Sequence, residues 1–226
     1  MTIQAVLFDL DGTLLHTAPD LAAAVNATLA DLGRSPLSVD QVAVYVGKGA
    51  DNLLHRSLTG HMEQTAAPEL FSKAKALWEV HYQRLNGAHA RLYPGVLEGL
   101  NALRQAGLKL AVVTNKPERF TVPLLEATGL AQYFSVTVGG DTCARKKPDP
   151  MPVQHACTQL NVSPSGALMI GDSVNDVLSA RAAGARCWLL PYGYNEGTPA
   201  SQTDCDGYIE TIAQAAERLL AAQVNP

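Results

Sequence analysis

Short runs of apolar residues recur along the chain with few polar interruptions. Five of these runs are rich in apolar and β-branched residues and have the length of strands: Ala5–Leu10, Leu108–Val113, Phe134–Val138, Ala167–Ile170 and Cys187–Leu190. Segments of helical length lie between the later runs: Val96–Ala106, Phe120–Thr128, Pro152–Leu160 and Asn175–Ala183. Buried strands that alternate with helices are typical of a parallel sheet covered on both faces. The pattern therefore predicts an α/β fold with a parallel sheet core.

The connection between the first and second runs is too long for a simple crossover, which needs roughly a dozen residues or slightly more. From Leu15 to about Leu92 the pattern is helical throughout, with helices expected from about Ala50 to Leu58 and from near Pro68. Thr17 and Asp20 have the spacing of a capping box at the start of the first helix. We therefore expect an all-helical insert at residues 16–92, and a discontinuous core made of residues 1–15 and 93–226.

Polar side chains stand at the carboxyl ends of the predicted strands. The first, second and fourth runs end in Asp9-Leu10-Asp11-Gly12-Thr13, Thr114-Asn115-Lys116 and Gly171-Asp172-Ser173, with Asp176 four residues past Asp172. The third run is followed by Gly139-Gly140-Asp141 and then by Lys146-Lys147-Pro148. In a parallel α/β sheet, ligands bind in the crevice outside the carboxyl ends of the strands. We therefore expect these carboxylates, the threonine hydroxyl and a lysine to meet at one edge of the sheet.

Carboxylates that meet in this way repel one another and need a cation. Oxygen ligands without histidine or cysteine suit a hard ion, Mg²⁺ above all. We expect Asp9, Asp11 and Asp172 to be metal ligands. Asp176 is a further candidate, which would bind the metal directly or stand behind the direct ligands.

The same residues suit phosphoryl transfer. Lys147 and Thr114 would supply a positive charge and a hydroxyl to the phosphoryl oxygens. A carboxylate beside a metal and a lysine is a known route to an aspartyl-phosphate, here on Asp9. Asp11 would protonate the leaving oxygen and then act as the base for the hydrolytic water.

Four motifs in this sequence resemble the signature motifs of the haloacid dehalogenase-like hydrolases, in the family's order. They are Phe8–Thr13, Thr114-Asn115, Lys147-Pro148 and Gly171–Asp176. The resemblance implies a Rossmann-like core with a helical cap, which matches the expected insert. It also implies that Asp9 is the nucleophile and a metal ligand, that Asp11 is the acid/base and binds metal through its backbone carbonyl, and that Thr114 and Lys147, not Lys146, hold the phosphoryl group. Asp172 and Asp176 match the two acids of the last motif.

A finer resemblance to the bacterial phosphoglycolate phosphatases rests on four segments: Val46–Ala50, Thr114–Pro117, Gly139–Asp141 and Tyr192–Asn195. It implies hydrolysis of a small anionic phosphomonoester such as 2-phosphoglycolate. We expect further substrate contacts from Gly12, Thr13, Asn115 and Lys48, with Lys48 meeting the second anionic group. Lys48 and His16 depart from the usual residues at their positions. Gly193-Tyr194-Asn195 is interpreted either as a turn or as a contact with substrate or cap.

Composition excludes several classes of protein. The 226 residues are 47% hydrophobic and 17% charged, with a formal net charge of −4, which favours a folded protein over disorder and argues against nucleic acid binding. No apolar stretch approaches the roughly 20 residues of a membrane span. The four scattered cysteines indicate reduced thiols, and the histidine spacing gives no zinc site. We expect a cytoplasmic monomer or homodimer.

Other functions remain open at this point. A sugar-phosphate phosphatase or a phosphomutase of the same superfamily would use the same residues. A dehalogenase has no use for the acid Asp11, and neither has a non-catalytic phosphate-binding relative. A phosphorylatable signalling receiver combines similar residues, but its phosphorylated aspartate follows a later strand and it lacks a helical insert of this size. Turnover of a generic aryl phosphate would separate the enzymes from the two non-enzymes.

Overall fold

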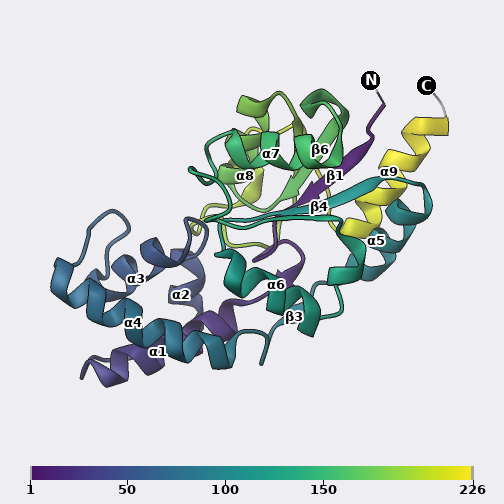
Figure 1. Cartoon of the computed structure of the whole chain (residues 1–226). Helices are drawn as coiled ribbons and strands as arrows, with labels where there is room; N and C mark the ends of the chain where they lie inside the picture. Colours follow the sequence, from purple (N-terminus) through teal and green to yellow (C-terminus); the bar gives the residue numbers. More distant parts are fainter. Residues whose placement is uncertain (1, 225–226) are drawn as a thin grey trace.

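A computed structural model describes residues 2–224, and within them a parallel sheet is covered by helices on both faces (Figure 1). The strand order is β5-β4-β1-β6-β7-β8, and every neighbouring pair is parallel. The strands are β1 (Ala5–Phe8), β4 (Lys109–Val113), β5 (Val136–Val138), β6 (Ala167–Gly171), β7 (Arg186–Leu189) and β8 (Gly207–Tyr208). The predicted α/β fold is confirmed. The short edge strand β8 and the last helix were not foreseen.

The helices of the core complete two apolar layers, one on each face of the sheet. They are α5 (Val96–Gln105), α6 (Glu118–Ala127), α7 (Met151–Leu160), α8 (Val174–Ala183) and α9 (Ile212–Val224). Val6 and Phe8 of β1 pack with α5 and α9, whereas Leu7 packs on the other face with α7 and α8. Burial of each such side chain contributes about 1.5–3 kcal/mol relative to exposure. Burial on both faces is the reason why the strands lack polar alternation.

The long connection forms a separate helical layer beside the sheet (Figure 1). It contains α1 (Ala18–Asp31), α2 (Val39–Tyr45), α3 (Ala50–Thr59) and α4 (Pro68–Leu85). These helices share an apolar cluster of their own, and Tyr82 of α4 also packs against Phe120 of α6, with ring centroids 5.0 Å apart. We propose that residues 16–92 act as a cap unit on the core. No helix among residues 2–224 combines the length and apolar character needed to cross a membrane.

The expectation of a wholly helical insert is wrong at its two ends. There, β2 (Leu15–His16) and β3 (Arg91–Leu92) pair as antiparallel strands, with Leu15 opposite Leu92. This two-stranded ladder joins segments far apart in the sequence, so no local pattern announces it. The ladder holds together the two places where the chain passes between core and insert.

The predicted capping box at the start of α1 is also wrong. The side chain of Thr17 makes no capping hydrogen bond. The backbone N–H groups of Thr17 and Ala18 instead donate to the Tyr194 hydroxyl, each at 2.9 Å. The buried carboxylate of Asp20 accepts from the backbone N–H groups of Gly87 and His89, at 2.8 and 2.7 Å. Asp20 therefore anchors the returning chain and does not cap its own helix.

Candidate active site

Three of the predicted acids meet at the carboxyl edge of the sheet. Asp9 follows β1, Asp172 follows β6, and Asp176 lies in the first turn of α8. Each offers a carboxylate oxygen, and these oxygens all lie within 4.8 Å of one another. The side chain of Asp11 is not part of this cluster and instead faces Lys116. The structure thus brings together three of the acids expected from two separate motifs.

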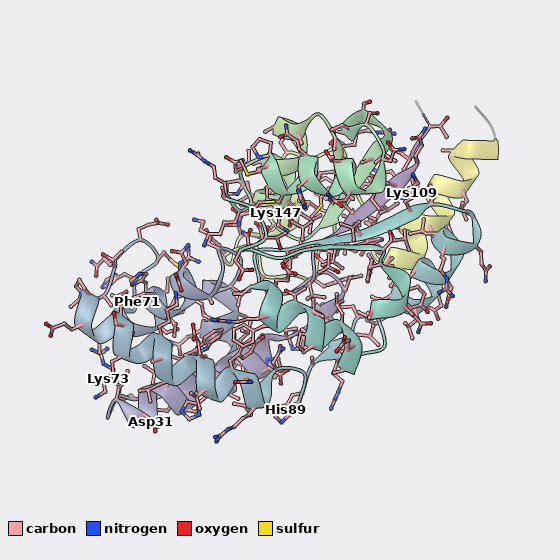
Figure 2. The ribbon with its side chains drawn as sticks, in the orientation of Figure 1. Asp31, Phe71, Lys73, His89, Lys109 and Lys147 are labelled. Atoms are coloured by element: carbon pink, nitrogen blue, oxygen red, sulfur yellow. The ribbon has the colours of Figure 1, made fainter. Side chains whose placement is uncertain are left out.

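Lys147 pairs with two of these carboxylates and lies on the side of the core that faces the insert (Figure 2). Its Nζ is 2.6 Å from Asp176 Oδ1 and 3.1 Å from Asp9 Oδ1, and it donates to the Val113 carbonyl at 2.7 Å. Burial lowers the pKa of Lys147, but the charges of Asp176 and Asp9 outweigh it and raise the pKa above its usual value. The ammonium therefore remains charged. Lys146 makes no ion pair with any residue in the described range 2–224, which agrees with the choice of Lys147.

Burial disfavours the charged forms of the clustered acids. It raises the pKa of Asp9 to about 6, with Asp176 and Asp11 adding to the effect and Lys147 opposing it. Burial, followed by the charges of Asp9 and Asp176, raises the pKa of Asp172 well above its usual value. One lysine does not neutralise this group. The oxygen-only donor set therefore fits a hard divalent cation.

The residues after β1 hold the Asp172 carboxylate in place. Thr13 Oγ1 donates to Asp172 Oδ1 at 2.7 Å, and the backbone N–H of Tyr194 donates to Oδ2 at 2.6 Å. Gly12 has φ +87°, and a Cβ there would lie 2.5 Å from Asp172 Oδ2. Gly12 and Thr13 therefore position Asp172, and this geometry gives no support to the expected substrate contacts.

Asp176 is held from several directions. Its Oδ2 accepts from the backbone N–H of Asp172 at 3.2 Å and from the backbone N–H and hydroxyl of Ser173 at 3.0 and 2.9 Å. Its other oxygen binds Lys147. The carboxylate thus caps α8 and orients the lysine, which leaves it little freedom to turn toward a ligand.

A cavity lies between the carboxylates and the insert, with about 470 Å³ of empty space counting its open mouth. Core and insert both line it, through Asp9, Asp11, Leu21, Val46, Gly47, Gly49, Ala50, Leu53, Trp78, Tyr82, Thr114, Asn115, Lys116 and Pro117. Asn115 Nδ2 donates to the carbonyls of Gly47 and Lys147, both at 2.9 Å, so it ties the insert to the core. The expected positions of Thr114 and Asn115 beside Asp9 agree with this lining.

Lys48 does not line the cavity. Its Nζ lies 3.2 Å from Glu196 Oε1 and 3.8 Å from Glu63 Oε1. The same Glu196 oxygen is 2.7 Å from Arg56 Nη2. Lys48 therefore belongs to an ion-pair group that joins the insert to the loop after β7. This placement gives no support to the expectation that Lys48 meets the substrate.

The sequence analysis did not identify Lys116 as a site residue, and it did not predict that Tyr82 lines the cavity. Lys116 is 5% exposed, and its Nζ lies 3.2 and 3.3 Å from the two oxygens of Asp11. It also donates to the Tyr82 hydroxyl from α4. Tyr82 packs in the insert as its apolar stripe predicts, but it lines the cavity as well. The sequence feature that could have indicated Lys116 is its position only two residues after Thr114, a predicted site residue.

The contacts of Tyr194 show what the segment 193–195, interpreted above as a turn or a contact with substrate or cap, does in the structure. Its backbone holds Asp172, and its hydroxyl lies 2.9 Å from His16 Nδ1, in β2 at the root of the insert. Asn195 Oδ1 accepts from the Val174 N–H at the start of α8. The segment is therefore a contact between the acid cluster and the root of the insert.

The family follows from comparison with known proteins. The model of the haloacid dehalogenase-like hydrolases matches residues 3–184, which is most of the chain. This chain belongs to the haloacid dehalogenase-like hydrolases. The resemblance inferred from the four motifs is confirmed, and the chain is an enzyme of the hydrolase class.

Individual members of this hydrolase family are similar over almost the whole length. A protein of Nitrosospira multiformis named phosphoglycolate phosphatase is 47% identical over 215 residues, covering 95% of each chain. The crystal structure of a predicted phosphoglycolate phosphatase from Haemophilus somnus has a TM-score of 0.90 at 34% identity, covering 96% of this chain and 98% of that one. The structure of CbbY from Rhodobacter sphaeroides in complex with phosphate has a TM-score of 0.76 at 27% identity, covering 94% of this chain and 96% of that one.

In this hydrolase, Lys147→Met is expected to lower the free energy of unfolding by about 3–5 kcal/mol, because it leaves Asp9 and Asp176 as buried charges without their cation. Asp9 would respond by taking up a proton, so its pKa in the folded state would rise further above the unfolded value. An acid whose pKa is raised in the folded state favours folding at low pH. The loss in free energy of unfolding caused by Lys147→Met should therefore shrink as the pH falls. Urea unfolding at pH 7.5 and pH 5.5 measures both effects.

Lys146→Met is the matched control, since this neighbour is less buried and lacks an ion pair within residues 2–224. It should change the free energy of unfolding by less than about 1 kcal/mol. Equal effects of the two substitutions would show that the pairing of Lys147 with Asp9 and Asp176 does not stabilise the fold.

Proposed function

We propose that this hydrolase is a Mg²⁺-dependent phosphoric monoester hydrolase that converts 2-phosphoglycolate to glycolate and phosphate through a phosphorylated Asp9. One observation carries the proposal: the Asp9 carboxylate lines the cavity, pairs with the buried Lys147 and lies beside Asp172 and Asp176. The names of the relatives support the choice of substrate. A relative solved with phosphate supports a phosphoryl ligand.

Mg²⁺ would be held by Asp9 and Asp172, with the backbone carbonyl of Asp11 as a further ligand. Asp176 is assigned to the layer behind these ligands, since Lys147 and the start of α8 already engage both of its oxygens. When bound, the ion would neutralise the carboxylates and the phosphoryl oxygens.

The first step would transfer the phosphoryl group to the protein. Lys147 and the Thr114 hydroxyl would hold phosphoryl oxygens, leaving the phosphorus in line with an Asp9 oxygen. That oxygen forms a bond to phosphorus while the bond from phosphorus to the glycolate oxygen breaks. Asp11 gives its proton to the departing oxygen, so the product leaves as the neutral hydroxyl of glycolate.

The second step would release phosphate. The deprotonated Asp11 takes a proton from a water molecule, whose oxygen then attacks phosphorus and breaks the bond to Asp9. This restores the Asp9 carboxylate and the protonated Asp11. The apolar side chains of Leu21, Val46 and Trp78 line the same cavity and would restrict water to the position of the leaving group.

A substrate panel tests the proposal directly. With purified protein and Mg²⁺, kcat/KM for 2-phosphoglycolate should exceed that for glucose 1-phosphate, glucose 6-phosphate and ethyl phosphate by roughly 10-fold or more, the value of one charge-assisted contact. Release of inorganic phosphate measures all four reactions. A higher kcat/KM for a sugar phosphate would assign the enzyme to the sugar-phosphate phosphatases instead, and turnover of none would reject the phosphatase function.

A further inference from the structure

Lys116 carries a charge that the steps above do not use. It stands in the loop after β4, and it is the one basic side chain among the described residues that line the cavity. Its side chain is 3% exposed. A buried ammonium is costly unless it is paired, and in this structure Lys116 pairs with the Asp11 carboxyl group.

The two acids that line the cavity, Asp9 and Asp11, each lie beside a different lysine. Lys147 lies 3.1 Å from Asp9, on the side of the metal-binding acids. Lys116 lies 3.2 Å from Asp11, against the insert. The first lysine serves the phosphoryl group in the proposed reaction. The second is placed next to the residue that would protonate the leaving oxygen, and so it lies on the side of the leaving group.

The insert holds the Lys116 ammonium in a fixed place. The Tyr82 hydroxyl accepts a hydrogen bond from Nζ, and the Tyr82 ring centroid lies 4.7 Å from it. Burial raises the pKa of Tyr82 well above its usual value, so the hydroxyl stays neutral and cannot replace an anion. The nearby insert side chains that line the cavity, Leu21, Leu53 and Trp78, offer no carboxylate.

We propose that Lys116 binds the carboxylate of the leaving group and sets the preference of this enzyme for small esters with a second negative charge. This inference rests on the proposed phosphatase function and assigns to Lys116 the contact first expected of Lys48. The ammonium has hydrogens enough to bind Asp11, Tyr82 and a substrate carboxylate together. A neutral leaving group offers Lys116 no partner beyond Asp11 and Tyr82, so it lacks the further contact that a carboxylate would provide.

The test compares two esters of nearly equal size, 2-phosphoglycolate and ethyl phosphate, which differ in the carboxylate. Lys116→Met should lower the ratio of kcat/KM for 2-phosphoglycolate to that for ethyl phosphate by roughly 10- to 100-fold, mainly through KM. Any disturbance of Asp11 affects both esters and cancels in the ratio. Lys116→Gln, which can still hydrogen-bond to Asp11 and Tyr82, serves as a second variant that preserves the packing and should show the same loss.

Lys48→Met is the matched control and should leave the ratio unchanged, because Lys48 pairs with Glu196 outside the cavity. An unchanged ratio in a folded Lys116 variant would overturn the inference, and so would an equal loss in Lys48→Met. Equal use of both esters by the unaltered enzyme would also overturn it while leaving the phosphatase function in place. Absence of turnover for both esters would reject the proposed function itself.

Discussion

Asp9→Asn is expected to lower kcat by on the order of 10³-fold or more, because it would remove the proposed nucleophile and a proposed metal ligand in one substitution. The amide has nearly the shape of the carboxylate, but its nitrogen and oxygen are poor nucleophiles. The Asp9 carboxylate lines the cavity beside Lys147, so the loss would occur at the proposed point of attack. Phosphate release from 2-phosphoglycolate under saturating substrate measures it.

The fold should survive this change. Lys147 keeps its 2.6 Å contact with Asp176, and the buried acid that is lost carries a raised pKa, which marks its charge as unfavourable. The midpoint of thermal unfolding should therefore stay close to that of the unaltered protein. Asp40→Asn, at an exposed position of α2, is the control for contaminating host phosphatase. Asp9→Asn protein with the activity of that control would contradict a covalent mechanism on Asp9.

The sheet could be predicted from the sequence because its strands are buried on both faces. In β1, Val6 and Phe8 pack on one face and Leu7 on the other, so the chain reads as one apolar run. The strand ladder of β2 and β3 could not be predicted, since its four residues pair across the whole insert. A buried strand is marked by its own run of apolar residues, whereas the pairing of two short segments far apart in the sequence has no such local mark.

The same distinction applies to the site. The positions of Asp9 and Asp172 follow from the rule that parallel strands end at one edge, which needs only the strand ends to be known. The contact between Lys116 and Tyr82 depends on how α4 of the insert lies against the core. The apolar stripe of α4 predicts that it packs, but not which core residue it meets.

Lys48 shows how a local motif can mislead. Its flanking glycines and the helix that follows it are both present, since α3 begins at Ala50. These features suit an anion, and the anion present is the Glu196 carboxylate of the core. The side chain is used to join insert and core, so the charge expected in the cavity comes from Lys116 instead.

Removal of divalent metal is expected to abolish turnover, and Mg²⁺ should restore it. Asp9, Asp172 and Asp176 crowd carboxylate oxygens within 4.8 Å, and Lys147 is the cation that balances them in the protein itself. Without a further cation the phosphoryl group would meet this negative charge directly. Phosphate release after treatment with a chelator, and again after addition of Mg²⁺ or Ca²⁺, measures the effect. Ca²⁺ should bind but support little reaction, because its looser coordination positions the nucleophile poorly.

The strength of Mg²⁺ binding should depend on pH in a direction set by the raised pKa values. With a pKa of about 6 for Asp9, and one well above the usual value for Asp172, protons occupy the ligands as the pH falls. Mg²⁺ must displace them, so its affinity should drop by up to about 10-fold per pH unit for each proton released, below pH 6. Calorimetric titration with Mg²⁺ at pH 7.5 and 5.0 measures this affinity independently of activity. Equal affinity at both pH values would contradict the pH prediction. Full activity after exhaustive chelation would contradict the metal requirement, and either result would show that the carboxylate cluster is not a metal site.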